Sequence, residues 1–213
     1  MISFLAVGHK SVQRLWMDDV ICSKLDTREL AEWISQCDDL KHLEFIANCP
    51  FDIIQKLSDK LRGLRTEVTL KDNNLGLIQN FSNLCSLHVR LETIIWDDPL
   101  QREILFFEAV VNLEGLETLI LENFSLELNI ISRKLEKGKL KRLTKLEIPY
   151  ISTGYESDVT YVVMIAQTLK YLRYLVFDAI YDISGIIEVV IYCLRPLFRH
   201  IHFLTYPLSS SRT

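Results

Sequence analysis

Apolar residues recur along this chain at a spacing that fits neither an amphipathic helix nor a simple alternating strand. The segment LETLILENFSL places leucine at positions 116, 119, 121 and 126. A helix needs apolar residues at steps of three and four over several turns, whereas a half-buried strand needs steps of two throughout. Neither template accounts for all four leucines.

The same spacing returns at eight places in the chain. The first position of each copy stands at 12, 40, 65, 84, 116, 143, 172 and 198, so the steps are 28, 25, 19, 32, 27, 29 and 26 residues. The third copy is irregular, because its expected first leucine is displaced to Leu64 and the later apolar positions fall on Val68 and Leu70. A period of this size indicates an array of supersecondary units.

Helices are predicted between several of these copies. Asp98 followed by Pro99 is an N-cap and first-turn pair that opens the run LQREILFFEAVVN, and Gly138 stands where a helix from about 126 would end. The step from 65 to 84 leaves no room for a full helix, so an extended or single-turn crossing is expected there. Four further segments have helical apolar spacing: ELAEWISQC, DIIQKLSDK, VTYVVMIAQTL and IIEVVIYCL.

The pattern L-x-x-L-x-L-x-x-N/C-x-L resembles that of leucine-rich repeats. The resemblance implies an α/β solenoid of about 7–8 repeats, with a curved parallel sheet on the concave side and helices on the convex side. One copy, LAEWISQCDDLKHLEFIANCP, is similar to the cysteine-containing subtype of F-box proteins, with Cys37 and Cys49 at the matching positions. That subtype implies an alternative role, substrate recognition in an F-box-type ubiquitin ligase complex.

The ninth position of such a repeat usually carries Asn or Cys, whose side chain bonds the exposed backbone of adjacent turns. Asn48 and Asn73 match this position, whereas Phe124 and Ile151 are among the apolar residues that occupy it in the C-terminal half. We therefore expect the later turns to be held by packing.

Composition agrees with one array. With 213 residues, 49% hydrophobic content and only 7 Gly and 5 Pro, we expect a single domain over 1–208 and a disordered tail over 209–213. The stretch before the first copy is short, so either the N-terminal cap is missing or another chain covers that end. Five scattered cysteines without a CxxC indicate free thiols, and no run suits a membrane span or a secretory signal, so we expect a cytoplasmic or nuclear protein.

Function is then sought on the exposed positions of the strands. Alternate strand residues face outward, and here they mix aromatic, aliphatic, acidic and imidazole side chains, which suits a protein surface. The strongest candidates for partner contact are Trp16, Arg90 and Tyr174, because aromatic and Arg side chains supply most of the binding energy at interfaces. In the third copy, the middle exposed position falls on Thr69. The predicted partner-binding residues are Trp16, Glu44, His88, Arg90, Ile120, Glu147, Tyr174 and His202.

One stretch has a strong charge. Residues 133–145 carry seven bases and one acid, a charge of +6 against −4 for the whole chain, so the remainder carries −10. A basic stripe could bind RNA or an acidic partner, but no aromatic residues interleave it, and bases at a helix end also complement the helix dipole. A solvated ridge is therefore the leading expectation. The bases are Arg133, Lys134, Lys137, Lys139, Lys141, Arg142 and Lys145.

No catalytic centre, cofactor or metal is predicted. The motifs GxGxxG, GxxxxGK[ST], GxSxG and HExxH are absent, and the acid pairs at 18–19 and 97–98 are adjacent in turns. Eight strands alternating with helices also describe a (β/α)₈ barrel, but such a barrel needs about 250 residues and loops suited to an active site. His200 and His202 share one strand face without evident further ligands. A non-catalytic module that binds another protein is the expected function.

Overall fold

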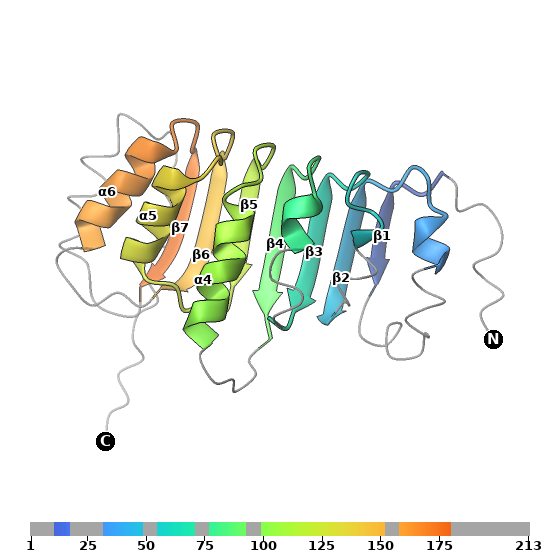
Figure 1. Cartoon of the computed structure of the whole chain (residues 1–213), viewed down its shortest axis with the longest axis horizontal. Coiled ribbons are helices and arrows are strands. Elements are labelled where there is room, and N and C mark those ends of the chain that lie inside the picture. The colour runs from blue at the N-terminus through green and yellow to red at the C-terminus, as the bar shows by residue number, and fades with distance from the viewer. Residues whose placement is uncertain are drawn as a thin grey trace, which may run out of the picture.

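Figure 1 shows a computed structural model of the chain, which describes residues 11–17, 32–48, 55–70, 77–92, 99–151 and 158–179. The strand expected from 198, the helix expected over 186–194 and the predicted site residue His202 lie outside these ranges. The elements in chain order are β1 (Arg14–Met17), β2 (His42–Asn48), β3 (Gly63–Val68), η3 (Leu77–Asn80), β4 (Ser86–Leu91), α4 (Pro99–Val110), β5 (Thr118–Glu122), α5 (Leu128–Lys137), β6 (Lys145–Ile151), α6 (Asp158–Thr168) and β7 (Tyr174–Ala179).

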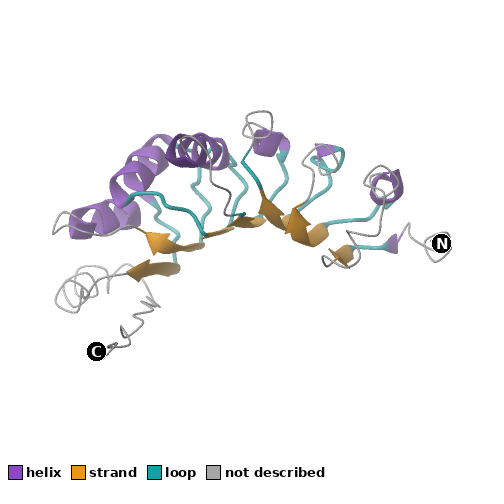
Figure 2. Ribbon diagram, turned by 90° about the horizontal axis from the view of Figure 1, so that it is seen from below, coloured by secondary structure: helices purple, strands orange, loops and turns teal. Residues whose placement is uncertain are grey.

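The fold is α/β, with one seven-stranded sheet in which every neighbouring pair is parallel. The strand order is β1-β2-β3-β4-β5-β6-β7, so each strand lies beside the next one in the chain. The helices cover one face of this sheet, and the strands form the inner layer of a shallow arch (Figure 2). Because β1 and β7 lie at opposite ends of the described sheet, these strands do not close into a barrel.

A single row of leucines crosses the sheet. The strand register aligns the row. All of its members are buried in the core, except the leucine of the first strand, which is only partly buried. Because a parallel pair hydrogen-bonds in register, one leucine per strand at the same position produces a continuous apolar seam. The row consists of Leu15, Leu43, Leu64, Leu87, Leu119, Leu146 and Leu175.

The third copy of the pattern begins at Leu61, and the sequence-based assignment to position 65 is wrong. Leu64 lies in the leucine row, and Leu61 is fully buried three residues earlier. The apolar pattern misled at this point because the next core-facing position is taken by Thr66, a buried polar residue. As a result, Arg65 takes the middle exposed position of β3, and Thr69 is buried after the strand.

Most of the predicted helical segments are confirmed. The helix α4 begins at Pro99, α6 covers the predicted run after residue 158, and the crossing before β4 is the single 3-10 turn η3. Residues 32–35 are helical as expected. The helix expected over 52–60 is wrong in its second half, since residues 56–60 form turns.

Gly138 follows α5 directly, as predicted, and its role is to allow close packing. Its φ of −79° is an ordinary value, so a left-handed backbone is not the reason for the glycine. A Cβ at this position would lie 2.8 Å from both the Cβ and the carbonyl oxygen of Val111. The next residue, Lys139, donates its N–H to that carbonyl at 2.7 Å. Two backbone segments therefore meet where a side chain would not fit.

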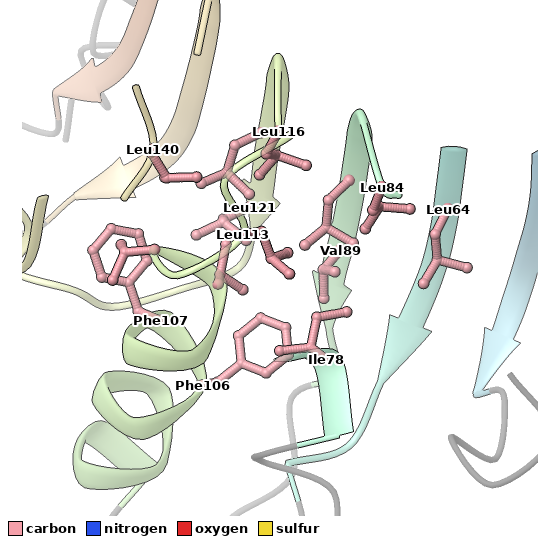
Figure 3. Packing of buried hydrophobic residues seen from close by; sticks show 14 of the residues in the cluster. Leu64, Ile78, Leu84, Val89, Phe106, Phe107, Leu113, Leu116, Leu121 and Leu140 are labelled. Atoms are coloured by element: carbon pink, nitrogen blue, oxygen red, sulfur yellow. The ribbon is translucent and has the colours of Figure 1, made fainter. Parts of the chain in front are cut away.

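The core lies between the sheet and the helices. Phe106 and Phe107 of α4 meet apolar side chains of the strands and their preceding turns, among them Val89 and Leu121 (Figure 3). The Phe106 ring also stacks on Phe124, with ring centroids 5.7 Å apart. Removal of apolar surface from water contributes about 25 cal/mol per Å², so this shared core is the main favourable term in folding. The expectation that packing holds the turn after β5 is confirmed at Phe124, which is fully buried.

Polar groups also hold the turns that follow the strands. The carboxylate of Glu103 in α4 accepts a hydrogen bond from the backbone N–H of Ser125 at 2.6 Å, and Glu103 is only 3% exposed. Asn123, which has a φ of 63°, donates its amide to the carbonyl of Leu91 at 3.2 Å. Side chains from a helix and a turn thus satisfy backbone groups that the sheet leaves without partners.

Candidate functional site

The candidate site is the open face, meaning the sheet face on the inner side of the arch, away from the helices (Figure 2). Each strand has two core-facing positions, the leucine of the row and the residue two positions later. Since strand side chains alternate between the two faces, the residues before, between and after these positions point to the open face. Three rows of side chains therefore run across the strands. The middle row consists of Trp16, Glu44, Arg65, His88, Ile120, Glu147 and Val176.

Seven of the eight predicted partner-binding residues lie on the open face, and the eighth, His202, lies outside the described residues. The most exposed large apolar side chains among them are Trp16, at 52%, and Tyr174, at 40%. Trp16 lies on β1 and Tyr174 on β7, at opposite ends of the described sheet. Any partner that contacts both residues must therefore cover the full width of this sheet, which requires a macromolecule and not a small ligand.

Four carboxylates of the open face are each paired with a base. Exposed ion pairs contribute only about 0–1 kcal/mol each to stability, so the main effect of the three Arg and Lys partners is to neutralise the charge of their glutamates. The pairs are Glu44 with Arg65 at 2.8 Å, Glu67 with Arg90 at 4.0 Å, Glu122 with His88 at 2.6 Å, and Glu147 with Lys145 at 2.8 Å.

A depression of about 450 Å³ lies on the open face over β1 to β5. Its lining includes Arg14, Trp16, His42 and Ile120, with Gly63 on β3 directly beside His42 on β2. A Cβ at Gly63 would lie 2.5 Å from Nδ1 of His42. The glycine is therefore needed because the imidazole occupies the space that a side chain would fill. The volume falls within the range of about 300–1,000 Å³ that is usual for binding pockets.

Burial lowers the pKa of the His42 imidazole, and neighbouring positive charges on Arg14, Arg62 and Lys41 lower it further. Desolvation disfavours the protonated ring, and like charges act in the same direction. The imidazole is therefore a neutral hydrogen-bonding group at pH 7, in a surrounding that already carries positive charge.

Two residues of this depression were missed by the sequence-based prediction. Gly63 and Arg65 could not be assigned to the open face while the third copy was placed at 65. A signal was present, because Leu61 and Leu64 have the correct spacing of three. The polar residue at Thr66 hid that signal.

The basic stretch 133–145 does not form one continuous patch. Arg133, Lys134 and Lys137 lie on α5, on the helical side of the sheet, whereas Lys145 lies on the open face. The bases between them lie in the turn that joins these two elements. Four of the seven contact carboxylates: Lys134 pairs with Glu108, Lys139 with Glu114 at 3.1 Å, Arg142 with Glu117 at 3.7 Å, and Lys145 with Glu147 at 2.8 Å.

Metal or thiol redox chemistry would need clustered ligands or reactive cysteines. Within the described ranges, no group of three or more His, Cys, Asp or Glu side chains is arranged to hold a metal ion. Cys37 and Cys85 are free thiols, and burial raises the pKa of Cys37. The Sγ atom of Cys37 lies 3.7 Å from the carbonyl oxygen of Trp33, where it contributes to packing at the end of a helical turn.

Comparisons with known proteins add no assignment. The sequence matches no protein-family model, and no curated protein is significantly similar to it. In the part of the chain that the structure describes, no helix combines the length and apolar character needed to cross a bilayer.

Proposed function

We propose that this chain is a leucine-rich-repeat solenoid of about 7–8 repeats that binds another protein through its open face, without catalysis. The leucine row, the parallel sheet in sequential order and the helices on one face are what stacked repeats of this kind require. The free thiols Cys37 and Cys85 support a location in the cytoplasm or nucleus, where thiols stay reduced.

One observation carries the proposal: large side chains stand exposed on a continuous sheet face where most of the described charges are paired. Trp16 is half exposed beside the 450 Å³ depression, and Tyr174 stands at the far end of the same face. Aromatic and Arg side chains supply most of the binding energy at protein interfaces, whereas paired charges around them mainly exclude water and set specificity. A solvated face has no need for such anchors.

The proposal can be tested by affinity purification from cell extract with a Trp16→Ala/Arg90→Ala/Tyr174→Ala variant. Loss of hot-spot side chains costs at least about 2 kcal/mol each, so proteins retained by the wild type should be lost from this variant. A control, Leu105→Ala/Arg133→Ala/Lys137→Ala, removes one exposed apolar and two exposed basic side chains from α4 and α5. If both variants lose the same proteins, or neither does, the open face is not the interface.

A second candidate is substrate recognition within an F-box-type ubiquitin ligase complex. Its support is Cys37, which is buried at the end of a helical turn just before the core residues Leu40 and Leu43. The test is whether material that co-purifies with the chain conjugates ubiquitin when ubiquitin-activating enzyme, conjugating enzyme and ATP are supplied. Unchanged, unmodified partners in that assay would argue against a ligase role and leave the binding role intact.

RNA binding through residues 133–145 is the weakest of the three proposals. The bases are divided between two faces, and four of them are paired with carboxylates. Counterion release requires several bases aligned on one phosphate backbone. We therefore expect no salt-dependent binding of single-stranded RNA in an anisotropy titration at low ionic strength, and tight binding there would reverse this ranking.

A further inference from the structure

Arg14 is the unpaired guanidinium within the described part of the open face. Its side chain is exposed on β1, and it contacts no carboxylate among the residues that the structure describes. By contrast, Arg65, Arg90 and Lys145 each lie against a glutamate. Among the described residues, three glutamates of this face are therefore neutralised by Arg or Lys, while the Arg14 guanidinium remains available at the edge of the depression.

The depression places three kinds of group side by side. Arg14 supplies a fixed positive charge with donors that fit a carboxylate, and the neighbouring strand supplies the His42 imidazole. Trp16 lies two residues after Arg14 and offers an exposed aromatic surface, with Ile120 at the far end of the lining. The lining thus combines a site for a negative charge with a site for an apolar side chain.

We propose that this depression binds an acidic segment of a partner protein, with a carboxylate on Arg14 beside His42 and an adjacent apolar side chain against Trp16. This inference rests on the proposed function, since it names the chemistry of the partner at the same face. An extended peptide suits the site, because the depression spans several strands and Gly63 leaves room for the His42 imidazole within it.

The charge count favours a short acidic peptide over a polyanion. Within the lining, the fixed charges are Arg14, Arg65 and Glu44, and the last two are paired with one another. One unpaired cation matches one or two carboxylates. A nucleic acid would leave most of its phosphates without partners, because its affinity comes from many aligned cations.

Binding of this kind should be favoured by mild acid. The charged groups around His42 are Arg14 on β1, Lys41 and Arg62 in the turns before β2 and β3, and the Arg65–Glu44 pair. A carboxylate bound beside the ring adds the opposite charge and favours the imidazolium form. The pKa of His42 should therefore rise on binding, and by linkage the affinity should increase as pH falls toward that pKa.

The experiment selects peptides from a random 12-residue phage library on the immobilised full chain, then measures each enriched peptide by fluorescence anisotropy. We expect enriched peptides to carry Asp or Glu next to an aromatic or aliphatic residue. Charge reversal by Arg14→Glu should lower the affinity for these peptides by about tenfold or more, because an interfacial repulsion replaces an attraction. Arg14→Gln should have an intermediate effect, and Arg133→Glu on α5, the matched charge reversal, should have none. Thermal melts confirm that each variant is folded.

A second readout is specific to the site. The His42 ring protons, followed by NMR across pH, should titrate at higher pH in the peptide complex than in the free protein. Peptides that need Trp16, Arg90 and Tyr174 but show no acidic preference and no response to Arg14→Glu would overturn this inference and leave the proposed function standing. Peptides that bind regardless of all these residues would overturn both. Displacement of the acidic peptides by polyuridylate, with the same dependence on Arg14, would overturn the inference in favour of nucleic acid.

Discussion

Glu103 is a buried carboxyl group whose titration should be visible in the stability of the whole domain. It lies in α4, only 3% exposed, and its single described partner is the backbone N–H of Ser125 at 2.6 Å. Burial raises its pKa from 4.5 to about 7, against the opposing effect of the Ser125 hydrogen bond. Desolvation dominates because one neutral donor cannot replace the hydration of a carboxylate.

The raised pKa of Glu103 determines whether the protein becomes more or less stable as pH rises. A carboxyl whose folded pKa exceeds its unfolded pKa binds a proton more tightly in the folded state, so its stabilisation is full below pH 4.5 and is lost as pH rises through 7. At 1.36 kcal/mol per pKa unit, the full shift corresponds to about 3 kcal/mol, most of which is lost between pH 5 and pH 8.

The decisive perturbation is Glu103→Gln, which keeps an oxygen acceptor for Ser125 and removes the charge. Urea unfolding at pH 5, 6, 7 and 8 should show the variant gaining about 2 to 3 kcal/mol relative to wild type between the lowest and highest pH. Glu136→Gln, at an exposed position of α5, is the matched control and should leave the wild-type pH dependence unchanged. Parallel stability curves for wild type and Glu103→Gln would refute the reasoning.

Substitutions at three further positions probe the fold through the same urea titration. Gly138→Ala places a Cβ 2.8 Å from two atoms of Val111 and should cost about 1–3 kcal/mol; no loss would mean that the two segments can separate freely. Asn123→Ala loses the bond to Leu91 and retains a φ of 63°, so it should cost about 2 kcal/mol, whereas Asn123→Gly, which tolerates that φ, should cost about half as much. Equal losses would show that backbone strain is unimportant there. Leu119→Ala in the leucine row should cost about 2–5 kcal/mol, and a cost below about 1 kcal/mol would contradict a tightly packed seam.

The resemblance to leucine-rich repeats predicted the parallel sheet, and the leucine spacing predicted the core positions of the later strands. The spacing of three and two survives intact at Leu116, Leu119 and Leu121, so the core positions of β5 follow from the leucine spacing by itself. This is possible because the pattern expresses a local requirement: each strand must present apolar groups to one side. The assignment of the third copy failed because Thr66, a polar residue, occupies a buried position of β3. The spacing of apolar residues therefore does not identify the buried positions there.

Only the tertiary structure decided how the open face is charged and shaped. His88 meets Glu122 across 34 residues of sequence, and Arg65 meets Glu44 across 21. Glu44 and Arg65 are partners in the register of β2 and β3, and His88 lies diagonally across from Glu122 on β4 and β5, so both contacts exist only once the strands lie side by side. The same holds for the stretch 133–145, whose bases appear as one run in the sequence but are divided by the fold between the helical side and the open face. Charge interactions depend on distance in space, whereas the apolar spacing of a strand depends on its own geometry, and for this reason the sequence specified the core and left the surface to the fold.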